Sequence, residues 1–164
     1  MHQKGHYGAA LVAYAPVVFV LTALGYTTLA LLGGAVVVGG AMLPDIDQRI
    51  PGVKHRGPTH TVWFALAVGA VAGVGGLLLG ASRGVLAALG TGLFGVVVGT
   101  LAVVAHILAD VLTPMGVHPF APVRGEKYTL NVVTAANPIA NYALLVLGAV
   151  VAGVAIVGGL ALGG

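Results

Sequence analysis

The chain has 164 residues, of which 59% are hydrophobic and only 7% are charged, with a mean hydropathy of +1.06. This composition lies far from globular averages and excludes an ordinary water-soluble domain, while the absence of cysteine excludes disulfides, a thiolate nucleophile and cysteine-ligated metal sites. The net charge of +3 comes from basic residues scattered over loops, so we expect no nucleic-acid partner.

The first uncharged stretch, residues 8–43, predicts two spanning helices rather than one. A single helix of this length would measure about 50 Å, at roughly 1.5 Å per residue, against a hydrocarbon core of about 30 Å. The natural turn begins at Gly25, which gives helices over residues 8–25 and 27–43. The residues before them show no small-residue cleavage site, so we expect them to belong to the mature protein.

Two polar loops interrupt the remaining apolar sequence, at residues 44–59 and 114–136. Between them we predict helices over residues 60–81 and 85–113, joined by a short turn at Ser82-Arg83-Gly84. The last helix, residues 138–162, begins with Asn137 as N-cap and Pro138 at its first position. The fold class is therefore all-α, a polytopic membrane helix bundle of about five helices that forms one integral membrane domain over residues 1–164.

This topology places both polar loops on one side of the membrane. Six of the basic residues share that side and only Arg83 lies opposite, so the positive-inside rule predicts that the side faces the cytoplasm. All histidines and acids fall on or near the same side: His2, His6, Asp45, Asp47, His55, His60, His106, Asp110, His118 and Glu126.

Three short patterns each supply two side chains of the kind that bind metals. They are Leu-Pro-Asp-Ile-Asp at residues 43–47, His-Arg-Gly-Pro-Thr-His at residues 55–60, and His-Ile-Leu-Ala-Asp at residues 106–110. His106 and Asp110 are four residues apart, so they project from one face of a helix. Carboxylate and neutral imidazole suit zinc, manganese or iron.

The energetic cost of these groups strengthens the metal hypothesis. A carboxylate and an imidazole inside a spanning helix cost several kcal/mol unless they are paired, hydrated or bound to a cation. Neighbouring carboxylates also repel each other unless a positive charge lies between them. One or two divalent ions would supply that charge, and a bound ion lowers the pKa of a coordinated water towards neutrality.

Other interpretations of the same residues stay open. Asp45 and Asp47 are also typical of a helix cap or an Asx turn, and His60 of a helix cap. His55 and Arg56 are also typical of charges that face anionic lipid. His106 and Asp110 are also typical of a hydrogen-bonded pair or a proton relay. His2, Glu126 and Asn141 are expected to play no part, and the role of His118 stays undecided.

Taken together, the three patterns resemble the YdjM-like family of membrane-bound metal-dependent hydrolases, over roughly residues 43–122. The third pattern continues in the family's manner to Val117, and the early His6 matches the family's amino-terminal histidine. The resemblance implies a metal site made by His6, Asp45, Asp47, His55, His60, His106 and Asp110. It also implies that Arg56, Thr59 and Thr113 lie around that site or contact substrate. Gln48 departs from the family, in which histidine is common at this point, and the loop to His55 is short.

A more distant similarity connects the His-x-x-x-Asp pattern with the all-helical zinc phospholipase C and nuclease group. That similarity favours phosphoester hydrolysis and is an analogy only. A late His and Glu pair is missing, so we expect one or two ions rather than three, with zinc first and manganese or iron as alternatives.

We therefore expect a membrane-bound metal-dependent hydrolase that cleaves a phosphoester or lipid-derived ester at the cytoplasmic interface. Asp45, Asp47, Arg56 and Asp110 are the predicted catalytic residues, with Arg56 or Arg124 steadying negative charge. The expected partners are the lipid bilayer and a lipid-derived or phosphorylated substrate. Two other hypotheses are an ion or proton transporter that uses His106 and Asp110, and a non-catalytic membrane scaffold stabilised by metal.

Overall fold

The computed structural model of the chain describes residues 1–163 and contains five long apolar helices. Each is long and apolar enough to cross a membrane, the second when Thr27–Arg49 is counted as one span, and no strand occurs within residues 1–163. The helices are α1 (Gln3–Ala23), α2 (Thr27–Gly40), α3 (Val62–Ala81), α4 (Val85–Val111) and α5 (Pro138–Gly163). The predicted all-α membrane bundle is confirmed, while Gly164, at the end of the predicted domain, lies outside the described residues.

The helix boundaries differ from the predicted ones mainly at α1. This helix begins at Gln3, five residues before the predicted start at residue 8, because apolarity marks the hydrocarbon core whereas a helix continues into the headgroup region. The predicted turn at Gly25 is confirmed, with φ of +80°, a left-handed conformation that glycine adopts without a Cβ clash. The early start of α1 brings His6 into the helix.

The first polar loop contains two short 3₁₀ helices, η1 (Pro44–Arg49) and η2 (Pro58–His60). The predicted start of the third helix at His60 was therefore two residues early, because Pro58 begins the separate turn of η2. The hydroxyl of Thr61 accepts from the Phe64 N–H at 3.3 Å and caps α3. At α5 the predicted cap is confirmed, since Asn137 Oδ1 accepts from the Ala140 N–H.

Small residues allow α3 and α4 to pack closely. Their interface contains Gly69, Gly73, Gly76 and Gly80 on α3, and Gly92, Gly95 and Gly99 on α4. A Cβ added to Gly76 would lie 2.1 Å from the backbone oxygen of Thr91. This close backbone approach is how helices associate in lipid, where burial of apolar surface gives little driving force.

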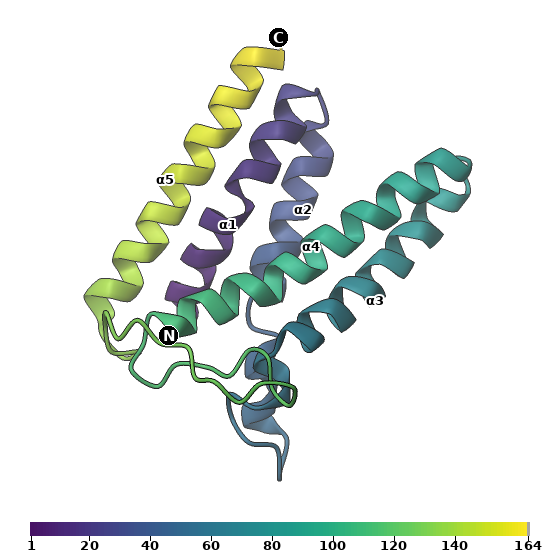
Figure 1. Cartoon of the computed structure of the whole chain (residues 1–164). Coiled ribbons are helices and arrows are strands. Elements are labelled where there is room, and N and C mark those ends of the chain that lie inside the picture. The colour runs from purple at the N-terminus through teal and green to yellow at the C-terminus, as the bar shows by residue number, and fades with distance from the viewer. Residues whose placement is uncertain (164) are drawn as a thin grey trace.

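A second close pair is α1 with α5, and α2 joins the two pairs by contacting both α1 and α4. The main core lies where α1, α2 and α4 meet, around Tyr14, whose hydroxyl donates to the Ala30 carbonyl. Figure 1 shows the α3–α4 hairpin running at an angle to α1, α2 and α5. The amino terminus and both polar loops lie at one end of the bundle, as predicted (Figure 1).

The glycine packing predicts a position-specific effect of one added methyl group. Gly76→Ala should destabilise the protein by about 1–3 kcal/mol, because the new Cβ forces the α3 and α4 backbones apart. Gly75→Ala is the matched control, since a Cβ there has no neighbour within 4 Å. Resistance to unfolding by sodium dodecyl sulfate in mixed micelles measures both, and equal loss in the two variants would contradict this packing.

Candidate metal centre

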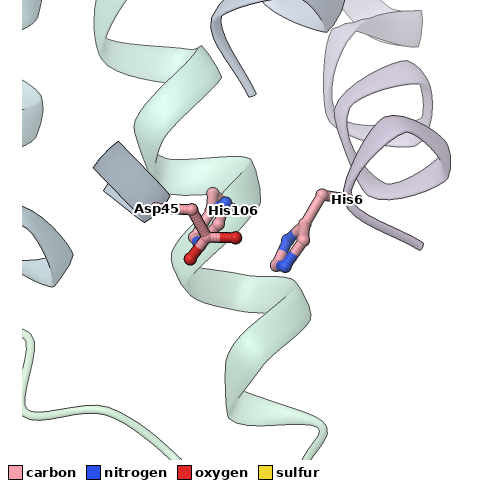
Figure 2. Close-up of side chains that lie close together, drawn as sticks. All are labelled: His6, Asp45 and His106. Atoms are coloured by element: carbon pink, nitrogen blue, oxygen red, sulfur yellow. The ribbon is translucent and has the colours of Figure 1, made fainter. Parts of the chain in front are cut away.

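Polar side chains from four elements meet at the loop end of the bundle. His6 comes from α1, Asp45 from η1, His60 from η2, and His106 with Asp110 from the last turns of α4. Four of these five side chains are almost completely buried, and the Asp45 side chain is 15% exposed. Figure 2 shows His6, Asp45 and His106 lying close together although they come from different elements.

Four ligand-type atoms form a compact group at the centre. His60 Nε2 and His106 Nε2 are 3.1 Å apart. Asp45 Oδ1 lies 3.5 Å from His60 Nε2 and 3.6 Å from His106 Nε2. Asp110 Oδ2 lies 3.6 and 3.7 Å from the same two nitrogens. Each carboxylate therefore approaches both imidazole nitrogens, and the ligand atoms of His60, His106 and Asp110 form one group within 4.8 Å of one another.

The hydrogen bonds around the two rings fix which nitrogen carries the proton. His106 Nδ1 lies 2.6 Å from the Ala41 carbonyl oxygen, which can only accept. His60 Nδ1 lies 3.0 Å from the Thr59 hydroxyl, whose own proton goes to Asp47 Oδ2. Both Nδ1 atoms must therefore donate, so in the neutral rings both Nε2 atoms present lone pairs.

The centre of the group consequently contains four acceptors and no donor of its own. Two Nε2 lone pairs face each other at 3.1 Å, with a carboxylate oxygen of Asp45 or Asp110 near each. Acceptors buried together repel each other unless a cation lies between them. Either a metal ion or an additional proton on one imidazole satisfies this arrangement.

The spacing of the four atoms suits a metal ion. Four ligands about 2.0–2.2 Å from one tetrahedral ion lie roughly 3.3–3.6 Å from one another. The distance of 3.1 Å between the two nitrogens and the four nitrogen–oxygen distances of 3.5–3.7 Å are close to this range. The donor set of two neutral imidazoles and two carboxylates fits zinc, manganese or iron. These buried side chains could therefore hold a divalent ion.

Asp47 lies outside this central group although it was predicted with Asp45. Its two carboxylate oxygens accept from the His55 ring, the Arg56 N–H and the Thr59 hydroxyl, at 2.9–3.0 Å. Oδ2 also lies 3.3 Å from Nδ1 of His60, on the side of the ring away from the central point. Asp47 thus orients the loop and the His60 ring, which is how a carboxylate behind a metal-binding histidine acts.

The Arg56 side chain is committed to contacts within the protein. Its guanidinium donates to Asp110 Oδ1 at 2.7 Å, and to the Thr113 hydroxyl and the Gly116 carbonyl at 3.0 Å each. Arg56 has φ of +59°, in the left-handed region, and its backbone N–H bonds to Asp47. The Asp110 carboxylate is therefore held by one oxygen and presents the other to the histidines.

His6 lies beside the centre, stacked on His106. Their ring centroids are 3.7 Å apart and the ring planes differ by 2°. His6 Nε2 lies 2.9 Å from the Met1 carbonyl and 3.6 Å from Asp110 Oδ1, which the Met1 amino group also contacts. His6 Nδ1 is buried without a hydrogen-bond partner in the described chain, so one acceptor is left over beside the central group.

His55 occupies the outer edge of the cluster. Its side chain is 38% exposed, and Nδ1 lies 3.0 Å from Asp47 and 4.0 Å from Asp45. His6 with Asp45 and His106, and His55 with Asp45 and His60, form further groups whose ligand atoms lie within 4.8 Å of one another. His118 is exposed and bonds to the Gly125 carbonyl, outside these groups.

Two structural contributors were not predicted from the sequence. Asn141, expected to play no part, is buried in α5, and its Oδ1 accepts from the His2 N–H, which anchors the start of α1 near the centre. The sequence did offer a signal for this role, because an amide side chain one turn into an apolar spanning helix needs a hydrogen-bond partner. The Ala41 carbonyl that orients His106 is a backbone group, so no residue type could reveal it.

Comparison with known proteins identifies one family. The family model described as YdjM inner membrane protein matches residues 1–162. Neither a curated protein nor a solved structure matches the chain. The match extends well beyond the three short patterns and includes all five helices.

The central group predicts selective loss of metal when one ligand is removed. His60→Ala should lower bound zinc or manganese in the purified protein at least about tenfold, because loss of a ligand costs more than loss of an outer contact. His118→Ala is the matched control, since this histidine is exposed and distant from the groups. Elemental analysis after gel filtration measures both, and equal metal in both variants would remove His60 from the site.

The position of Asp47 predicts a different effect from that of a ligand. Asp47→Asn should weaken metal affinity about 10–100-fold while leaving the number of bound ions at saturating metal unchanged, because the His60 ring loses its orienting carboxylate. Titration with a competing chelator measures affinity and stoichiometry together. Loss of a whole equivalent of metal would instead make Asp47 a ligand.

Proposed function

We propose, from the premise that this chain belongs to the YdjM inner membrane protein family, that it is a metal-dependent hydrolase of phosphoesters or lipid-derived esters. The observation that carries the proposal is the approach of acceptor atoms from His60, His106, Asp45 and Asp110, together with a surface pocket lined by His55 and Arg56, which neighbour these ligands. A structural ion needs only to be enclosed, whereas hydrolysis needs an approach for the substrate. The pocket is the proposed approach, since its lining residue Arg56 donates to Asp110.

The four central residues would hold the first ion, and His6 and His55 flank the positions at which a second would share ligands with it. A divalent ion bound there would lower the pKa of coordinated water and so supply hydroxide near neutral pH. Zinc is the first choice for this donor set, followed by manganese or iron. The remaining residues shape and orient this centre.

Arg56 and Asp47 are assigned positioning roles. Arg56 holds Asp110 through Oδ1, so that Oδ2 stays directed towards the histidines. Asp47 accepts from the Thr59 hydroxyl, so that His60 Nδ1 donates to Thr59 and Nε2 of His60 is directed inwards. Arg124 is exposed in the second loop and the Arg56 guanidinium is engaged by Asp110, so stabilisation of negative charge is assigned to Lys54, which lines the pocket.

The pocket has a volume of about 840 Å³ and lies between the loop before α3 and the loop after α4. Its lining includes Lys54, His55, Arg56 and His118, and none of its lining residues is acidic. A cavity whose lining contains the basic side chains of Lys54 and Arg56 and the aromatic Trp63 suits an anionic ester at the membrane surface. By the positive-inside rule this surface is cytoplasmic.

Transport is a weaker alternative for these residues. A conducting path needs polar groups across the whole membrane, but the histidines and acids of the described chain all lie towards the loop end. At the other end, the buried Thr22 hydroxyl bonds to the carbonyls of its own helix. A non-catalytic scaffold would need no pocket beside the ion, so the pocket favours hydrolysis.

Hydrolysis should depend on metal and on Asp110. Purified protein should cleave bis(p-nitrophenyl) phosphate or phospholipid vesicles, lose activity with a chelator and regain it with zinc or manganese. Asp110→Ala should lower the rate at least about a hundredfold, because it removes a metal-binding carboxylate. Glu126→Ala, an exposed acid of the second loop, is the matched control.

Metal bound by wild type without turnover of any phosphoester or carboxylic ester would contradict catalysis and favour the scaffold. Metal-independent proton or ion flux in proteoliposomes, abolished by Asp110→Ala, would favour the transporter instead.

A further inference from the structure

A second, wholly apolar groove runs along the bundle between α2, α3 and α4. It has a volume of about 420 Å³ and is lined by residues of all three helices: Val36, Gly40, Leu43, Phe64, Ala67, Val68, Val71, Ala72, Gly99 and Ala102. The α3–α4 hairpin diverges from α2 on this side (Figure 1). The groove therefore lies among residues that face the hydrocarbon core.

Several lining residues of this groove lie close in sequence to residues of the candidate metal centre. Gly40 immediately precedes Ala41, whose carbonyl bonds to His106, and Ala102 lies one helical turn before His106 on the same face of α4. Leu43 is two residues before Asp45. The groove extends about two turns away from the cluster, from Phe64 to Ala72 on α3.

Phe64 connects the groove with the cationic pocket, because its side chain lines both. On one side of Phe64 lie Lys54 and His118, and on the other lie only apolar residues. A pocket with basic side chains and an apolar groove are thus neighbours that share Phe64. This arrangement complements a molecule with a charged head and a long apolar tail.

We infer that the substrate is a phosphate-bearing membrane amphiphile whose alkyl or acyl chain lies in the groove between α2, α3 and α4 while its headgroup occupies the cationic pocket. The inference rests on the proposed function for the identity of the site and adds the class of substrate. The molecule enters sideways from the bilayer, so its chain stays in an apolar environment throughout. A soluble phosphoester would leave the groove unused.

Direct binding tests this inference without requiring turnover. Trp63 is the only tryptophan of the chain and lines the pocket, so a bromine on a bound ligand quenches its fluorescence. The probe is dodecyl phosphate brominated near the headgroup, added to protein in an uncharged detergent of constant concentration. Three competitors separate the contribution of the alkyl chain from that of the phosphate charge. They are unlabelled dodecyl phosphate, ethyl phosphate without the chain, and dodecyltrimethylammonium with the opposite charge.

Two matched variants test the groove itself. Ala67→Phe fills the groove from α3, whereas Ala70→Phe adds the same ring to an exposed position of the same helix that lines neither cavity. Ala67→Phe should weaken binding of the brominated probe about tenfold, the cost of excluding roughly two methylene groups, and Ala70→Phe should leave it unchanged. Neither substitution introduces a second tryptophan.

Only dodecyl phosphate should restore the fluorescence at low concentration. Equal competition by ethyl phosphate would show that the chain adds nothing, and equal competition by dodecyltrimethylammonium would show that the charge is not recognised. Either result overturns the inference. Absence of quenching by the brominated probe, or equal weakening of its binding by Ala67→Phe and Ala70→Phe, also overturns it. Because hydrolysis is not measured, a protein that binds the probe without cleaving esters would contradict the proposed function alone.

Discussion

The arrangement of the whole polar end depends on one electrostatic constraint, the approach of four buried acceptors to a common point. Two imidazole lone pairs and two carboxylate oxygens cannot share a dry space without a positive charge between them. The protons of both rings are committed to the Ala41 carbonyl and to the Thr59–Asp47 pair, so the rings cannot relieve this repulsion by exchanging tautomers. A divalent ion bound among these atoms would supply that charge.

The helix packing makes this convergence possible. Glycine interfaces bring α3 to α4 and α1 to α5, while α2 contacts both pairs. The residue after α2, Ala41, contacts His106 near the end of α4, and η1 follows it in the chain. Arg56 then ties the first loop to the end of α4 through Asp110 and Gly116.

The sequence predicted the fold well because hydrocarbon thickness determines helix length and apolar residues reveal it directly. It predicted that His60, His106, Asp45 and Asp110 lie close together, because scarce polar groups in an apolar chain need partners. It could not separate Asp45 from Asp47, since their difference lies in which way a 3₁₀ turn directs each carboxylate. Nor could it show that Arg56 is used internally, because that depends on a left-handed backbone conformation and on the Gly116 carbonyl.

X-ray absorption at the edge of the co-purified metal tests the central claim most directly. If a cation lies among the four acceptors, the spectrum will show a first shell of nitrogen and oxygen atoms at about 2.0–2.2 Å together with the multiple scattering of two imidazole rings. His106→Ala should reduce the imidazole contribution by half. A purified, folded protein without stoichiometric metal, or a metal shell without imidazole scattering, would contradict the claim.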